Sequence, residues 1–402
     1  MTGLLGIASL LLLAYALSSN RRRINWRTIG LAFAIQVILG AFVIYLPFGQ
    51  QVLFQVTQVV AAIIGFANQG IIFVFGEIGN FSQGFVFAVH VLSVIVFFSS
   101  LIAVLYHLGV MLWMIRLIGG ALQKVLGTSR PESMSAAANI FVGHTEAPLV
   151  IRPFISTMSR SELFAVMVGG LATVAGSVLA GYAGLGVELK YLISASFMAA
   201  PGGFLMAKMI LPETEETKND LTEVVSEKAH ANVIDAAAAG AADGMKLALN
   251  VGAMVLAFVG LIALLNGLLG WIAGFFGVDG LTLQLVIGYL FQPLAWLIGV
   301  TWDEAQLAGS FIGQKLVINE FVAYLDFVRY QDELTEKTQV IVTIALCGFA
   351  NFASIAVLLG GLGSIAPNRR SDIAELGLKA LLAATLANLM SAAIAGVFFS
   401  LI

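Results

Sequence analysis

The stretch Gly313-Gln-Lys-Leu-Val-Ile-Asn-Glu320-Phe-Val-Ala-Tyr324 sets a lysine and a glutamate among apolar residues. It lies in a region, Leu297 to Arg329, that also contains Gly309. The apolar pieces of this region are too short to cross a bilayer, which takes about 20 residues of helix. The region therefore predicts a re-entrant hairpin, a segment that enters the membrane and leaves it on the same side.

A second region has the same character. The apolar stretch Met134 to Ile155 lies between basic residues that mark the cytoplasmic side, within the region Gly119 to Ser161. Each predicted hairpin is followed by an apolar span with polar residues in its middle, Thr173 to Ser177 in one and Asn351 to Ser354 in the other. Such paired, interrupted segments indicate a transporter whose binding site lies at the membrane midplane.

The composition places the rest of the chain in a membrane as well. Of 402 residues, 59% are hydrophobic and 11% are charged, against roughly 25% charged in soluble domains. Continuous runs rich in Leu, Ala and Gly favour an all-α polytopic protein over a barrel of short alternating strands. The runs of spanning length are Gly3 to Leu17, Ile29 to Leu46, Val89 to Ile118, Leu163 to Leu185, Met245 to Phe276 and Ile373 to Ile402.

The arginines predict the orientation in a bacterial inner membrane. Arg21, Arg22, Arg23 and Arg27 follow the first span, and basic clusters mark the cytoplasmic side. Arg369 and Arg370 precede the last span. Both termini are therefore expected on the periplasmic side, with an even number of crossings.

Glu146 and Glu320 are the acids that the sequence sets most deeply among apolar neighbours. A charge at the bilayer centre costs about 2.5 to 3.5 kcal/mol on insertion scales, so such residues usually have a function. The alternative is that each glutamate lies at an aqueous hairpin tip or pairs with a nearby cation such as Arg152 or Lys315.

The polar side chains near the two hairpins suit two kinds of ligand. Carboxylates, amides and hydroxyls can hydrogen-bond a neutral, polyhydroxylated solute, and the candidates are Thr145, Glu146, Glu320, Asn351 and Ser354. Asn139 and Thr173 offer neutral oxygens, which suit a hard cation such as Na⁺. His144 either contacts substrate or forms an ordinary hydrogen bond, and Phe349 either stacks on a base or packs in the core.

These motifs resemble those of the concentrative nucleoside transporter family. Residues 313–324 are similar to the family signature G-x-K-x₃-N-E-F-V-A, and Asn139-Ile-Phe-Val-Gly-His-Thr-Glu146-Ala-Pro-Leu is similar to its first hairpin motif. Cys347-Gly-Phe-Ala-Asn351-Phe-Ala-Ser354-Ile resembles the motif of the penultimate span. Gly170-Leu-Ala-Thr-Val-Ala-Gly-Ser-Val and Ala200-Pro-Gly-Gly also match in kind, so the resemblance covers essentially the whole chain.

The resemblance implies a homotrimer of eight-span protomers, each with two oppositely oriented hairpins and a transport domain that moves like an elevator against a scaffold. It implies sodium-coupled uptake of uridine-like nucleosides. The base would meet Gly143, His144, Thr145, Glu146 and Val178, and the ribose would meet Glu320, Asn351 and Ser354, with Phe349 nearby. Sodium would meet the side chains of Asn139 and Thr173 and the carbonyls of Val142 and Val174. His144 stands where the family commonly has Gln, which leaves the base preference open.

The expected organisation has six parts. They are N-terminal spans, mostly scaffold (1–118), the first hairpin and following spans (119–210), a polar loop with an interfacial helix (211–244), a long scaffold span with a connector (245–296), the second hairpin with a discontinuous span (297–366), and a last span (367–402).

Three other functions stay open at this point. They are a proton-coupled nucleoside transporter of the same fold, a passive channel, and an intramembrane hydrolase. A hydrolase would need a nucleophile and a base within reach, and the sequence shows no such pair, so we expect a transporter rather than an enzyme. The four histidines and the single Cys347 form no metal-site spacing. We expect no cofactor besides the coupling ion, and no nucleic-acid partner.

Overall fold

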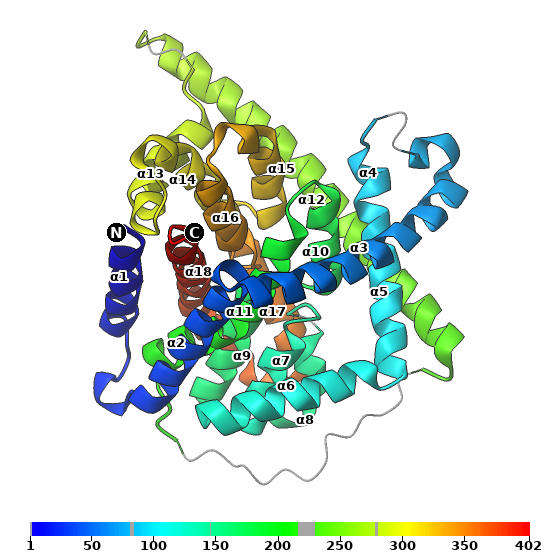
Figure 1. Ribbon diagram of the computed structural model, residues 1–402, viewed down its shortest axis with the longest axis vertical. Coiled ribbons are helices and arrows are strands. Elements are labelled where there is room, and N and C mark those ends of the chain that lie inside the picture. The colour runs from blue at the N-terminus through cyan, green and yellow to red at the C-terminus, as the bar shows by residue number, and fades with distance from the viewer. Residues whose placement is uncertain (1, 81–83, 145, 216–229, 278–279) are drawn as a thin grey trace.

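The computed structural model describes residues 2–80, 84–144, 146–215, 230–277 and 280–402. Within these ranges every regular element is a helix. The helices are α1 (Thr2–Ala16), α2 (Trp26–Gly40), α3 (Pro47–Phe75), α4 (Phe87–His90), α5 (Leu92–His107), α6 (Val110–Leu126), α7 (Arg130–Ala138), α8 (Arg152–Ile155), α9 (Arg160–Ala172), α10 (Gly176–Gly184), α11 (Leu189–Ile210), α12 (Val233–Gly274), α13 (Leu283–Leu297), α14 (Trp302–Val317), α15 (Glu320–Tyr330), α16 (Glu336–Leu346), α17 (Phe352–Ile365) and α18 (Arg370–Phe399) (Figure 1).

The lengths and hydropathy of the helices confirm the predicted all-α polytopic fold. Among the described residues, seven helical stretches are long and apolar enough to cross a bilayer. The count rises to eight if α13 and α14, which bend by 115° at their junction, form one broken span. The helices α1 and α17 are apolar but shorter.

The first third of the chain differs from the sequence expectation in two places. The run Val89 to Ile118 is not one span, because Gly109 adopts a left-handed conformation (φ 77°) and separates α5 from α6. The 29-residue helix α3 was not expected at all. Its length and hydropathy are nevertheless those of a membrane-spanning segment.

The polar region before α12 also differs. The expected interfacial helix within 211–244 is not a separate element in the part that is described, because residues 233–244 form the start of the 42-residue helix α12. The acidic residues Glu216, Asp220, Glu223 and Glu227 lie outside the described residues.

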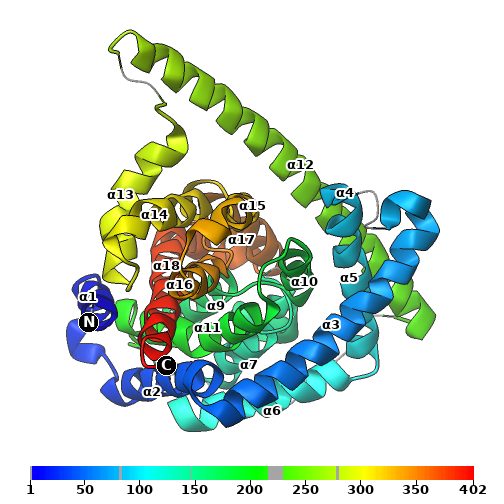
Figure 2. The same ribbon diagram turned by 45° about the horizontal axis from the view of Figure 1, so that its top comes forward.

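Two groups of helices can be distinguished. The helices α5 and α12 pack along each other, and α3 contacts α5 at the edge of the molecule (Figure 2). Gly240 and Gly244 of α12 allow this close approach, because a Cβ on Gly244 would lie 2.7 Å from the Cβ of Ser99. The second group has α9, α11, α16 and α18 at its centre, with α1 packed on α18 and α2 on α11.

Candidate functional site

Interrupted helices come together at the centre of the second group. The helix α9 ends at Ala172, and α10 begins only at Gly176, because Thr173 is extended. Likewise α16 ends at Leu346, and α17 begins after Asn351, which is also extended. These interruptions free backbone groups that a continuous helix would use.

Direct hydrogen bonds join three of the unwound segments. The amide of Phe349 donates to the carbonyl of Thr173 at 3.1 Å, so the two interrupted spans touch at their breaks. The amide of Gly176 donates to the carbonyl of Phe141 at 2.9 Å, which brings in the segment after α7. Regions more than 170 residues apart in the sequence are therefore assembled into one site.

Asn388 of α18 and Lys315 of α14 brace these breaks. The Asn388 amide Nδ2 donates to the carbonyls of Ala172 (2.7 Å) and Cys347 (3.3 Å), at the ends of α9 and α16. The ammonium of Lys315 donates to Asn388 Oδ1 and to the Ala345 carbonyl, both at 2.8 Å. Two buried polar side chains thus satisfy carbonyls that the helix ends leave without partners.

Glu320 is held by two side chains from other elements. Its Oε2 accepts from Asn351 Nδ2 at 2.9 Å, and its Oε1 accepts from the Tyr182 hydroxyl at 3.1 Å. Only 4% of Glu320 is exposed. Lys315 is not its ion-pair partner among the described residues, since no nitrogen of Lys315 lies within 4.0 Å of a carboxylate there.

Asparagine caps fix the local geometry around this acid. Asn319 Oδ1 accepts from the amide of Val322 at the start of α15, and Asn351 Oδ1 accepts from the amide of Ser354 at the start of α17, each at 2.9 Å. Asn351 therefore uses its oxygen for the helix cap and its nitrogen for Glu320.

His144 and Asn139 lie together against α9, with polar atoms that have no partner. The His144 ring meets the Phe349 ring edge to face at 4.9 Å between centroids. Both ring nitrogens of His144 and the Oδ1 of Asn139 are buried and form no hydrogen bond with the residues that the structure describes. Gly170 permits this packing, because a Cβ there would come within 2.8 Å of the His144 Cβ. Buried polar atoms without partners are rare in proteins, and a bound ion, water or ligand is one way to satisfy them.

The predicted sodium ligands are neutral oxygens, the kind of ligand that a hard cation takes. Thr173 Oγ1 donates to the Gly169 carbonyl at 2.9 Å, which leaves its lone pairs free to accept. The carbonyls of Val142 and Val174 accept no backbone hydrogen bond in the part of the chain that the structure describes. Asn139 Oδ1 is a further neutral oxygen, and Asn139 packs against Gly169 and Gly170 near the end of α9.

The two glutamates of the predicted repeat are not equivalent. Glu146 has more exposed surface than Glu320, so the two acids differ in their surroundings. Its Oε2 accepts from the Gly143 amide at 3.3 Å, which ties it to the turn that carries His144. Val178 and Ser354 are buried on α10 and α17. Thr145 lies outside the described residues.

Two residues of the site were missed from the sequence. Tyr182 contacts Glu320 from 138 positions earlier in the chain, and Asn388 bridges two breaks that lie 216 and 41 positions before it. For Asn388 a signal exists, because a lone amide in the middle of an apolar helix usually bonds a neighbouring helix. For Tyr182 no signal separates it from other membrane tyrosines.

Comparison with known proteins decides the family. Residues 191–396 match the family "Na+ dependent nucleoside transporter C-terminus", 5–78 match the corresponding N-terminus family, and 88–188 match "Gate: Nucleoside recognition". The chain belongs to the Na⁺-dependent nucleoside transporter family. This membership confirms the predicted resemblance and the expectation of a transporter rather than an enzyme.

Relatives of this transporter family align over nearly the whole chain. The nucleoside permease NupC of Helicobacter pylori is 53% identical over 98% of this chain and 97% of its own. Human sodium/nucleoside cotransporter 1 is 37% identical over 98% of this chain and 63% of its own. The structure of CNTnw in an inward-facing substrate-bound state is similar with a TM-score of 0.96 at 56% identity, covering 100% of this chain and 98% of that one. An outward-facing CNTnw structure reaches a TM-score of 0.97 with the same identity and coverage.

Proposed function

We propose that the protein is a sodium-coupled symporter that moves uridine-like nucleosides into the cell by alternating access. The observation that carries this proposal is the set of unpartnered buried atoms, Asn139 Oδ1 and the His144 nitrogens, beside the junction of two interrupted helices. Transporters of this kind bind solute and coupling ion where helices are broken. The names of the relatives, a nucleoside permease and sodium/nucleoside cotransporters, support the choice of solute and ion.

The nucleoside would span the distance between His144 and Glu320. The ribose hydroxyls would donate to the Glu320 carboxylate and bond Asn351 and Ser354, while the base would lie near Gly143, His144, Glu146 and Val178. Phe349 supports this arrangement, because it contacts the His144 ring and lies two positions from Asn351, the partner of Glu320. Thr145 belongs to the proposed base-binding set on the grounds of its motif.

Sodium would bind between the first hairpin and the break in the α9–α10 span. Its proposed ligands are the side-chain oxygens of Asn139 and Thr173 and the carbonyls of Val142 and Val174. Because Phe349 bonds the Thr173 carbonyl directly, occupation of the ion site would order the segment that leads to the nucleoside site. Through this contact, bound sodium would raise the affinity of the protein for the nucleoside.

The proposed architecture follows the two helix groups. The segments α7–α8 and α14–α15 would form re-entrant hairpins of a moving transport body, and α3, α5 and α12 would form the fixed scaffold of a homotrimer. The helices α1 and α2 would travel with the transport body, because they pack on α18 and α11. The protein would lie in the bacterial inner membrane with both termini periplasmic, which the arginine clusters support.

Uptake of labelled uridine into proteoliposomes tests the proposal, with Na⁺, H⁺ and voltage gradients imposed one at a time. A tenfold Na⁺ gradient supplies about 1.4 kcal/mol, and 100 mV adds about 2.3 kcal/mol for one charge. One sodium ion per cycle would thus sustain uridine accumulation of several hundredfold. Accumulation on a proton gradient without Na⁺ would establish the proton-coupled alternative, and equilibration without accumulation would establish a passive route.

A further inference from the structure

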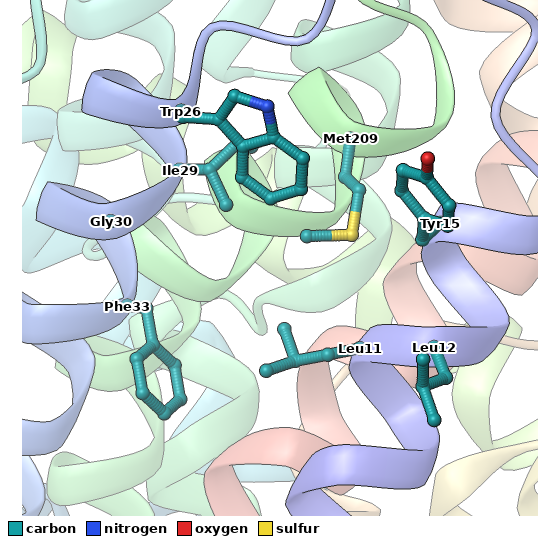
Figure 3. A pocket seen from close by; sticks show the side chains of 8 residues that line it. All are labelled: Leu11, Leu12, Tyr15, Trp26, Ile29, Gly30, Phe33 and Met209. Atoms are coloured by element: carbon teal, nitrogen blue, oxygen red, sulfur yellow. The ribbon is translucent and has the colours of Figure 1, made fainter. Parts of the chain in front are cut away.

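An apolar groove lies between α1 and α2, and none of its lining residues belongs to the proposed nucleoside site. It has a volume of about 500 Å³ and is lined by Leu11, Leu12, Tyr15, Trp26, Ile29, Gly30, Phe33 and Met209. Figure 3 shows the side chains of α1 and α2 facing each other across this groove, with Met209 of α11 between them. From Trp26 to Phe33 the α2 wall rises about 10 Å.

One end of the groove is closed by aromatic rings and capped by a cation. The rings of Tyr15 and Trp26 lie 6.2 Å apart between centroids. The guanidinium of Arg21 lies 5.3 Å from the centre of the Tyr15 ring and donates to the Ala16 carbonyl at 2.8 Å. Arg21 is thereby fixed at the mouth of the groove, and an arginine has further N–H donors left for an anion.

Two further arginines are neighbours in sequence of residues at this mouth, since Arg22 follows Arg21 and Arg27 follows Trp26. Arg22 and Arg27 are exposed and, like Arg21, form no ion pair with any described carboxylate. Arg23 faces away toward a separate polar pocket that contains Glu132, Lys208 and Glu213. An apolar groove thus ends at Arg21, and two more exposed arginines each adjoin a residue of its mouth in the sequence.

We propose that the α1–α2 groove binds one acyl chain of an anionic phospholipid, whose phosphate lies on Arg21, Arg22 and Arg27. The aliphatic and aromatic lining suits a hydrocarbon chain, and the arginines suit a head group of net negative charge. The positive-inside rule places the mouth in the cytoplasmic leaflet, where anionic lipids attract basic segments. Because α1, α2 and α11 all line the groove, the lipid would join three helices that touch the proposed transport body.

Trp26 provides a reporter, because 61% of it is exposed and it lines the groove. We would titrate purified protein in detergent with phosphatidylglycerol or phosphatidylcholine that carries brominated acyl chains, and follow quenching of tryptophan fluorescence. The Trp26→Phe variant gives the signal of the other four tryptophans to subtract. The expected result is saturable quenching of Trp26 at a concentration of phosphatidylglycerol about tenfold or more below that of phosphatidylcholine.

Two variants separate the head-group contacts from the groove. Arg21→Gln with Arg27→Gln should reduce the preference for phosphatidylglycerol by about tenfold or more, since each basic residue near an anionic surface contributes about fivefold. The matched control, Arg116→Gln with Lys124→Gln, removes two exposed charges from α6 and should leave the preference unchanged.

Gly30→Leu tests the acyl chain itself. A Cβ at Gly30 meets no atom within 4 Å, so a leucine can fill the groove without displacing its neighbours. It should abolish the saturable component, whereas Gly65→Leu, on the equally open surface of α3, should retain it. Linear quenching that is equal for both lipids, or saturable quenching that survives Gly30→Leu, would overturn the proposal.

Discussion

Asn139 combines nearly complete burial, with 1% exposure, and a side-chain oxygen without a hydrogen-bond partner in the described part of the chain. If this oxygen binds sodium, Asn139→Ala should raise the Na⁺ concentration for half-maximal uptake by about tenfold or more, since a ligand bond is lost. Uridine affinity at saturating Na⁺ should change far less. The measurement is uptake at varied Na⁺ in proteoliposomes, and an unchanged Na⁺ dependence would place the ion site elsewhere.

Glu320 offers a test of the ribose contact. Hydrogen bonds from sugar hydroxyls to a carboxylate contribute roughly 1.5 to 3 kcal/mol. Glu320→Gln should therefore weaken uridine binding by about tenfold or more, and should weaken binding of a dideoxy analogue much less, because that ligand has already lost the donors. Calorimetry on variants whose elution matches the wild type measures both. Equal losses would instead indicate a conformational or protonation role for this acid.

The single residues show what local sequence can predict. Asn139, Glu320 and Asn351 stood out because polar groups in a membrane are costly and therefore rare, and the structure brings Glu320 and Asn351 into direct contact. Glu146 satisfied the same criterion yet is exposed, since the criterion measures the neighbours in sequence rather than the neighbours in space. Tyr182 was missed for the same reason, because its contact with Glu320 joins residues 138 positions apart in the sequence.

At the scale of elements, Asn388 of α18 holds the ends of α9 and α16 together. Asn388→Ala would leave two buried carbonyls and one donor of Lys315 without partners, which should destabilise the protein by about 3 kcal/mol or more. Because both breaks would loosen together, Na⁺ and uridine affinities should fall in parallel, unlike the separate effects expected for Asn139→Ala. Thermal unfolding and binding measurements together distinguish these patterns.

Asn266→Ala is the matched control for this variant. Asn266 of α12 also uses both side-chain atoms, accepting from the Leu283 amide at 2.7 Å and donating to Gln284 at 2.9 Å, but it lies outside the site. Its loss should lower stability without changing either affinity. If Asn388→Ala behaved in the same way, Asn388 would have only a structural role.

The ends of the helices could be predicted from the sequence where the hydropathy changes. They could not be predicted where only the backbone conformation separates two helices. The turn between α5 and α6 depends on the left-handed Gly109, with apolar residues on both sides, so an average over the sequence joins the two helices. The start of α12 at Val233 was hidden by its small and charged first turns. The α9–α10 break, by contrast, was visible as Thr173 to Ser177 within an apolar span.

At the scale of the whole molecule, the division into two groups of helices cannot be read from apolar runs alone, because both groups contain helices apolar enough to span a bilayer. It follows from contacts such as Gly244 against Ser99, which join α12 to α5. In the proposed elevator motion, the interface between α5 and α12 would stay intact while α10 slides along α5.

Engineered disulfides at the two interfaces test this motion. A Cβ on Gly181 of α10 would lie 3.4 Å from Val91 Cγ1, so Gly181→Cys with Val91→Cys should form a bridge across the proposed sliding surface. Gly252→Cys with Leu92→Cys is the matched pair within the scaffold, since a Cβ on Gly252 would lie 2.9 Å from Leu92 Cδ1. Cys347 is buried and should not interfere.

In the variant with cysteines at positions 181 and 91, oxidation should abolish uridine uptake, because the disulfide fixes α10 to the scaffold. A reductant should restore uptake. The Gly252–Leu92 pair should form its bridge and still transport, because α5 and α12 move as one unit. Cross-linking measured on the same vesicles shows whether each bridge has formed. Full transport with a complete Gly181–Val91 bridge would mean that α10 does not move against α5, and substrate would then have to reach the other side of the membrane by local opening of the hairpins.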